Sequence, residues 1–75
     1  MKEEKEFLEQ QLRWTKEQIR ILGEMDEKLQ EMKKIAEYAA GNGLSLNERE
    51  KLNSQLEKLK SEYDLLEKQR YTLLN

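Results

Sequence analysis

The first candidates for chemistry are carboxylates, because the 75-residue chain contains neither histidine nor cysteine. Glu24, Glu27 and Glu31 are spaced so that they share one helical face, and together they could bind a divalent cation. The spacing of a calcium-binding loop does not surround them, and a solvated charged face explains them better. We therefore expect no metal site.

The serines and glycines do not form a catalytic or phosphate-binding pattern either. Ser45, Ser54 and Ser61 have no base beside them in the sequence, and the Gly-Asn-Gly of residues 41–43 lacks the Gly-Lys-Ser/Thr of a phosphate loop. The absence of histidine and cysteine removes the commonest metal ligands, general bases and thiol nucleophiles. We predict that the chain is not an enzyme and uses no cofactor.

Composition and charge favour long solvated helices. Charged residues make up 40% of the chain and apolar residues 36%, and proline is absent. The net charge of −2 is nearly balanced and lysine alternates with glutamate, so the clustered cations that hold a nucleic acid are missing. The longest apolar run has three residues, too few for a membrane span or a signal-peptide core. We expect a cytoplasmic protein that contacts neither nucleic acid nor membrane.

The apolar residues follow a mirror pattern centred near residues 41–43. Positions on its two sides pair off so that the residue numbers of each pair add to 88. Two helices folded back on each other at a short turn place such pairs opposite one another. The pattern predicts an all-α, coiled-coil-like antiparallel hairpin, with helices over about 2–40 and 46–73 and a turn at 41–45. The predicted facing pairs are Ala36 with Leu52, Met32 with Leu56, Leu29 with Leu59, Met25 with Tyr63, and Leu22 with Leu66.

The turn contains stop and start signals for the two helices. Gly41 and Gly43 predict a helix end with a glycine in the left-handed conformation, and Asn42 tolerates the same region. Ser45 and Glu48 have the spacing of a capping box at the start of the second helix. The predicted seam of the first helix is Leu8, Leu12, Thr15, Ile19, Leu22, Met25, Leu29, Met32, Ala36 and Ala39.

Part of the apolar surface has no partner inside the predicted hairpin. The first 12 residues overhang, because position 13 would face the last residue, and Trp14, Ile21 and Ile35 form a stripe beside the seam. A two-helix hairpin buries little apolar surface, so we expect a four-helix assembly, as a dimer or with another helical protein. The predicted protein-interaction residues are Phe7, Leu8, Leu12, Trp14, Ile21, Met32, Ile35 and Ala39.

Residues 22–64 resemble the amino-terminal helical hairpin of the filament-core domain of bacterial flagellin. That family has Leu-Gln-Arg-Met-Arg-Glu-Leu-Ala-Val-Gln-Ala-Ala-Asn-Gly, a short polar turn and a second helix. Asn42 and Gly43 come one residue later than the family's Asn-Gly, and residues 45–49 resemble its Ser-x-Glu-Asp-Arg cap. The positions that match without a gap are Leu29, Gln30, Met32, Ile35, Ala36, Ala39 and Ala40.

The resemblance implies a helical packing element of a flagellin-like assembly, in which Met32, Ile35 and Ala39 would contact a flagellar protein. It also implies possible export by a flagellar-type system without a cleavable signal. The family's hydrophobic terminal segments are absent, and Glu31 and Lys33 replace the arginines of its Arg-Met-Arg pattern, so we do not expect a complete filament subunit. The alternative is a regulatory or chaperone-type hairpin that captures an amphipathic helix of an unrelated protein.

Overall fold

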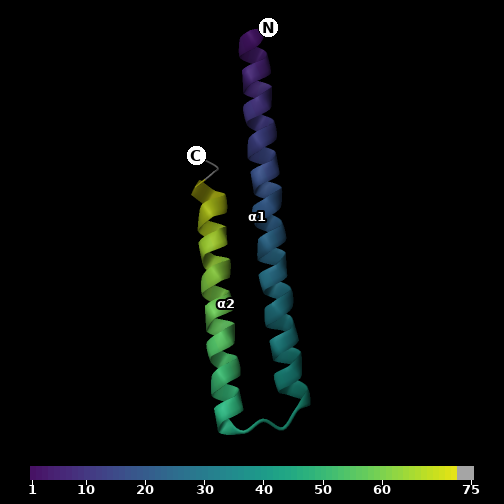
Figure 1. Cartoon of the computed structure of the whole chain (residues 1–75), viewed down its shortest axis with the longest axis vertical. Coiled ribbons are helices and arrows are strands. Elements are labelled where there is room, and N and C mark those ends of the chain that lie inside the picture. Colours follow the sequence, from purple (N-terminus) through teal and green to yellow (C-terminus); the bar gives the residue numbers. More distant parts are fainter. Residues whose placement is uncertain (73–75) are drawn as a thin grey trace.

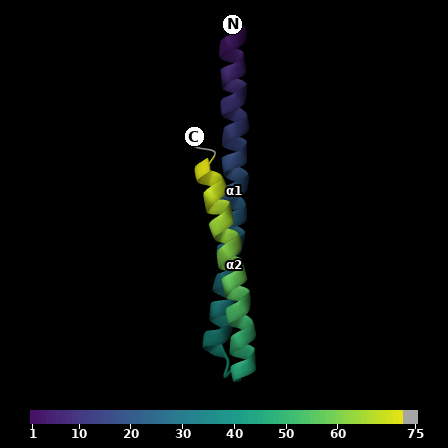
Figure 2. The same cartoon turned by 90° about the vertical axis from the view of Figure 1, so that its left-hand side faces the viewer.

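The computed structural model describes residues 1–72 and contains two antiparallel helices joined by a short turn (Figure 1). Helix α1 spans Lys2–Gly41 and helix α2 spans Leu46–Thr72. The two helices form a rod with extents of 65 × 18 × 10 Å, and the shorter helix α2 lies beside part of α1 (Figures 1 and 2). The predicted all-α hairpin is confirmed. Leu73, the predicted end of the second helix, lies outside the described residues.

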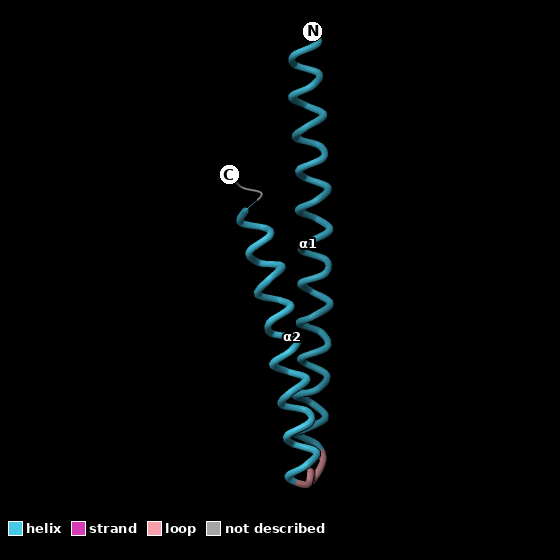
Figure 3. The backbone as a smooth tube through the Cα atoms, turned by 60° about the vertical axis from the view of Figure 1, so that its left-hand side comes forward, coloured by secondary structure: helices cyan, strands magenta, loops and turns pink. Residues whose placement is uncertain are grey.

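A short loop joins the two helices (Figure 3). Side-chain hydrogen bonds cap the helix ends on both sides of it. Asn42 follows α1 with an extended backbone (φ −128°, ψ 139°), and its side-chain amide donates to the Tyr38 carbonyl over 2.8 Å. No glycine in residues 1–72 has a positive φ, so the predicted left-handed glycine is wrong. The asparagine amide satisfies a terminal carbonyl in its place. At the start of α2 the Glu48 amide donates to Ser45 Oγ over 3.2 Å, which confirms the predicted serine cap.

The face of α1 that packs on α2 shares Met25 and Met32 with the predicted seam, but its other members lie one residue before the predicted positions. Ile21, expected beside the seam, is fully buried, whereas Leu22 and Leu29 are 43% and 46% exposed. Ala36 is exposed as well, so the predicted pairs of these three residues with α2 are wrong. On α2 the predicted face is correct, because all its seam residues from 52 to 66 are buried or half-buried. The packed residues of α1, here called the inner stripe, are Gln18, Ile21, Met25, Lys28, Met32 and Ile35.

The axial register of the hairpin is the predicted one, although the face of α1 differs. Gln18 Nε2 donates to the carbonyl oxygen of Arg70 over 3.2 Å, and the numbers 18 and 70 add to 88. Lys28 Nζ lies 2.6 Å from Glu62 Oε2, within two residues of the same register. One residue along an α-helix corresponds to a rotation of about 100°. Relative to the prediction, α1 is therefore rotated about its axis without sliding along it.

The hairpin buries few side chains. In residues 1–72 the buried apolar residues are Ile21, Met25 and Leu59, and Gln18 is the buried polar one. Ordering a residue costs about 1–2 kcal/mol in backbone entropy, while burying a large aliphatic side chain contributes about 1.5–3 kcal/mol. So small a core favours further contacts outside the hairpin.

Ile21→Ala and Ile19→Ala are matched substitutions that separate the two faces of α1. Truncating Ile21 leaves a cavity between the helices and should lower the free energy of unfolding by about 2–5 kcal/mol. Ile19 is 64% exposed, so its truncation should change that free energy by less than about 1 kcal/mol in dilute solution. Urea unfolding followed by circular dichroism at low protein concentration measures both. If both substitutions lower the free energy of unfolding equally, or Ile19→Ala lowers it more, the seam predicted from the sequence is the correct one.

Candidate helix-packing surface

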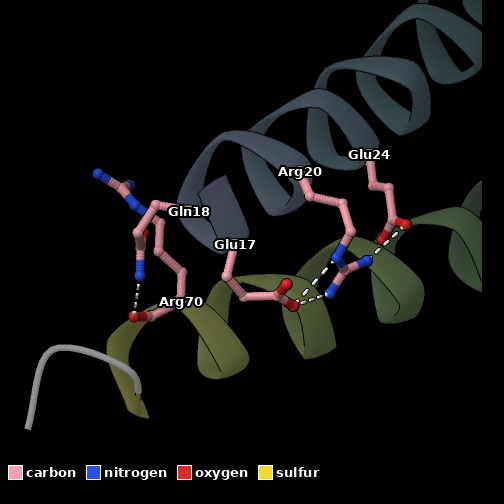
Figure 4. Close-up of polar contacts among 5 residues, drawn as sticks. All are labelled: Glu17, Gln18, Arg20, Glu24 and Arg70. Atoms are coloured by element: carbon pink, nitrogen blue, oxygen red, sulfur yellow. Dashed lines mark hydrogen bonds and ion pairs between the residues drawn. The ribbon is translucent and has the colours of Figure 1, made fainter. Parts of the chain in front are cut away.

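Several charged and polar side chains of α1 form ion pairs or hydrogen bonds within the hairpin (Figure 4). Arg20 donates to Glu17 and, over 2.7 Å, to Glu24, which lie within one turn on either side of it. The hydrogen bond with Arg20 lowers the pKa of Glu17, and both carboxylates raise the pKa of Arg20. The Gln18 side chain reaches across to the backbone of Arg70. These contacts stabilise α1 and its alignment with α2.

A second ion pair, between Lys28 and Glu62, joins the two helices. Both side chains are about one-third exposed, and the distance from Nζ to Oε2 is 2.6 Å. Their hydrogen bond lowers the pKa of Glu62 and raises the pKa of Lys28. Lys28 occupies an inner-stripe position, so this contact favours the observed face of α1 against α2.

The grooves of the hairpin offer apolar contacts more than reactive groups. A groove of about 470 Å³ runs between the helices near the open end, and its lining includes Ile21, Leu65 and Thr72. No group of three acidic side chains in the described part of the chain is placed to hold a metal ion. No helix within residues 1–72 combines the length and apolarity needed to cross a membrane.

Helix α1 extends well beyond the end of α2 (Figure 1). Since Gln18 is level with Arg70, Thr72 is level with position 16, and about the first four turns of α1 run past it. Phe7 and Leu8 are more than half exposed on this overhang. The overhang therefore adds apolar surface that α2 does not cover.

A continuous stripe along α1 is left uncovered by α2. It keeps steps of three and four residues from position 8 to position 36, which is a contact line of about 42 Å at 1.5 Å per residue. Every member is exposed, and five members are large aliphatic side chains. This exposed stripe consists of Leu8, Leu12, Thr15, Ile19, Leu22, Asp26, Leu29, Lys33 and Ala36.

Some of the residues predicted to bind a partner are buried or half-buried in the hairpin, and the others are exposed. Ile21 is fully buried against α2, so the prediction that it contacts a partner is wrong. Met32 and Ile35 are half-buried in the inner stripe, and Ala39 is exposed beside a shallow groove near the turn. On the overhang, Phe7, Leu8 and Leu12 are exposed and Trp14 is 37% exposed.

Sequence reasoning missed the three large aliphatic residues Ile19, Leu22 and Leu29 of this surface, because it assigned them to the seam of the hairpin. The signal was present in the sequence. Two sets of positions on α1 keep heptad spacing, one residue apart, and one neighbouring helix can cover only one of them. Treating both as seams would have assigned one to α2 and one to a partner.

Lys28→Gln should lower the thermal midpoint near neutral pH, and the difference from wild type should vanish in acid. The ion pair stabilises the fold above the ordinary glutamate pKa of about 4.3 and is lost as the pH falls through the lower folded pKa of Glu62. The contribution is also lost as the pH rises through the raised pKa of Lys28. Thermal unfolding over this pH range, with the exposed Lys60→Gln as control, measures the effect. A difference that stays constant into strong acid would contradict this assignment.

Comparison with known proteins adds no relative to this description. No protein-family model, no curated protein and no solved structure matches the chain.

Proposed function

We propose that the chain is a non-catalytic helical assembly module that acts by coiled-coil packing through its exposed stripe. The observation that carries the proposal is the spacing, since nine positions in steps of three and four all stay exposed in the hairpin. Such spacing is typical of the seam between coiled-coil helices. Large aliphatic side chains that line up on the surface of a small protein mark a candidate interaction site. A helix from outside the hairpin would cover the stripe.

The distribution of apolar side chains supports the same role. The exposed stripe carries five large aliphatic residues, while the hairpin buries three apolar residues among those described. At about 1.5–3 kcal/mol for each large aliphatic side chain fully buried, covering the stripe would add to the apolar stabilisation that the small core of the hairpin provides. Assembly and folding would then support each other.

A flagellin-like assembly is the narrower form of this proposal. Its support is the sequence pattern from Leu29 to Ala40. Leu29 lies on the exposed stripe, while Met32 and Ile35 face α2, so a flagellar protein would meet Leu29 before it meets Ile35. The alternative, a regulatory or chaperone-type hairpin that captures an amphipathic helix of an unrelated protein, would use the same stripe.

Leu22→Glu tests the packing role, because it places a carboxylate in the middle of the exposed stripe. Covering that charge would remove its water, so association with a second copy or with purified flagellin should be lost. Helix content should persist, since Leu22 is not in the inner stripe. The matched control is Tyr38→Glu, which changes a 54% exposed side chain of α1 outside the stripe. Sedimentation analysis and circular dichroism measure association and folding.

Each outcome decides one form of the proposal. If Leu22→Glu associates as strongly as wild type, the exposed stripe is not the packing surface. If wild type binds itself but not flagellin, the packing role stands and its flagellin-like form falls. If wild type binds neither, the capture of an unrelated helix becomes the better interpretation.

A further inference from the structure

We propose that the exposed stripe is covered by the same stripe of a second copy, running antiparallel, with facing residue numbers that add to 41. This inference rests on the proposed packing role and names its partner and geometry. It follows from the order of residues along the stripe, which is self-complementary in this one arrangement.

Over its six central layers the antiparallel register pairs apolar residues with apolar ones and polar with polar, while Leu8, outside these layers, lies against Lys33 of the second copy. Leu12 faces Leu29 of the second copy, Ile19 faces Leu22, and Thr15 faces Asp26. Two-fold symmetry repeats each layer, so six successive layers contain four aliphatic pairs and two polar pairs. The Thr15 hydroxyl, which donates to the Gln11 carbonyl over 2.8 Å in the hairpin, would turn to donate to the Asp26 carboxylate, where the bond is charge-assisted.

Asp26 excludes the competing arrangements of the stripe. Parallel helices in register would place the Asp26 carboxylates of the two copies against each other. Sliding the antiparallel pair by one heptad in either direction would place Asp26 against a leucine, Leu8 or Leu22. Burying an unpaired charge carries a penalty of several kcal/mol. A single polar residue in an apolar seam is a known way to fix register and orientation.

Gly23 is consistent with close approach of the second copy. Glycine inside a helix is destabilising by about 0.5–1 kcal/mol relative to alanine. A Cβ atom at Gly23 would meet nothing within 4 Å in the hairpin, so packing against α2 does not require this glycine. It follows Leu22, near the two-fold axis between positions 20 and 21, where the helix backbones of the two copies would lie closest to one another.

The same register also covers part of the overhang. Residues 5–15 of α1 would lie against residues 26–36 of the second copy, so Leu8 and Leu12 would no longer face water. The two α1 helices would form the centre of a four-helix assembly, with one α2 packed on the inner stripe of each. The exposed stripe thus continues the packing already present in the hairpin, on the adjacent face of the same helix.

Leu12→Cys and Leu29→Cys, made as separate proteins, test the register, because the chain has no cysteine of its own. Mixed and treated with a short bis-maleimide, they should crosslink to a mixed dimer, since positions 12 and 29 face each other. Neither protein should crosslink with itself, because equal positions lie about 25 Å apart along the helix axis. The matched control, Leu12→Cys mixed with Tyr38→Cys, should give no crosslink.

Asp26→Leu tests the orientation independently of the crosslinked pair. Removing the charge should tighten self-association at least tenfold and should let Leu12→Cys crosslink with itself, because parallel pairing is no longer penalised. Asp26→Asn, which retains a hydrogen-bonding side chain, should keep the mixed crosslink as the main product.

Two results would overturn the second-copy proposal. A wild-type chain that stays monomeric at all accessible concentrations would do so, as would self-crosslinking of Leu12→Cys in a background that retains Asp26. Both leave the exposed stripe available to a different helix, so the packing role would survive. That role fails if a helical partner that binds the wild type binds Leu22→Glu equally strongly.

Discussion

A single neighbouring helix can cover one face of a straight helix, and α1 carries two apolar faces set one residue apart. Helix α2 covers the inner stripe and leaves the exposed stripe about 100° away in water. With 40 residues in α1 and 27 in α2, the overhang cannot be covered from within the described hairpin. The small core, the exposed leucines and the overhang all follow from this mismatch between one helix and its partner.

Polar residues favour the observed choice between the two faces of α1. On the inner stripe, Gln18 and Lys28 find partners on α2, at the Arg70 carbonyl and the Glu62 carboxylate. If the exposed stripe were turned toward α2 at the same register, Asp26 would be level with Glu62, and two carboxylates would face each other. Like charges in a helix interface are unfavourable, so the face with matched partners is selected although both faces carry comparable apolar residues.

The sequence was sufficient for both ends of α1 to within one residue, the start of α2, the serine cap and the axial register, because each depends on local or mirror-related residues such as Ser45 and Glu48. It was insufficient for the rotation of α1. Ile21 and Leu22 belong to two sets of heptad-spaced positions one residue apart, and periodicity alone does not show which set packs on α2. Choosing between the two sets needed the contact of Lys28 with Glu62, which is known only when both helices are in place. The glycine cap was also mispredicted, because Asn42 satisfies the helix end through its side chain.

The most direct test of two-faced packing is hydrogen exchange of the α1 backbone at several protein concentrations, resolved along the sequence. An overhang that has no neighbouring helix should exchange quickly, whereas one covered by another α1 should be protected. The account predicts that protection of residues 5–15 rises steeply with concentration, while residues 18–35, already packed on α2, are protected even in dilute solution. Fast exchange of residues 5–15 at every concentration, in a chain whose residues 18–35 remain protected, would contradict assembly through the exposed stripe.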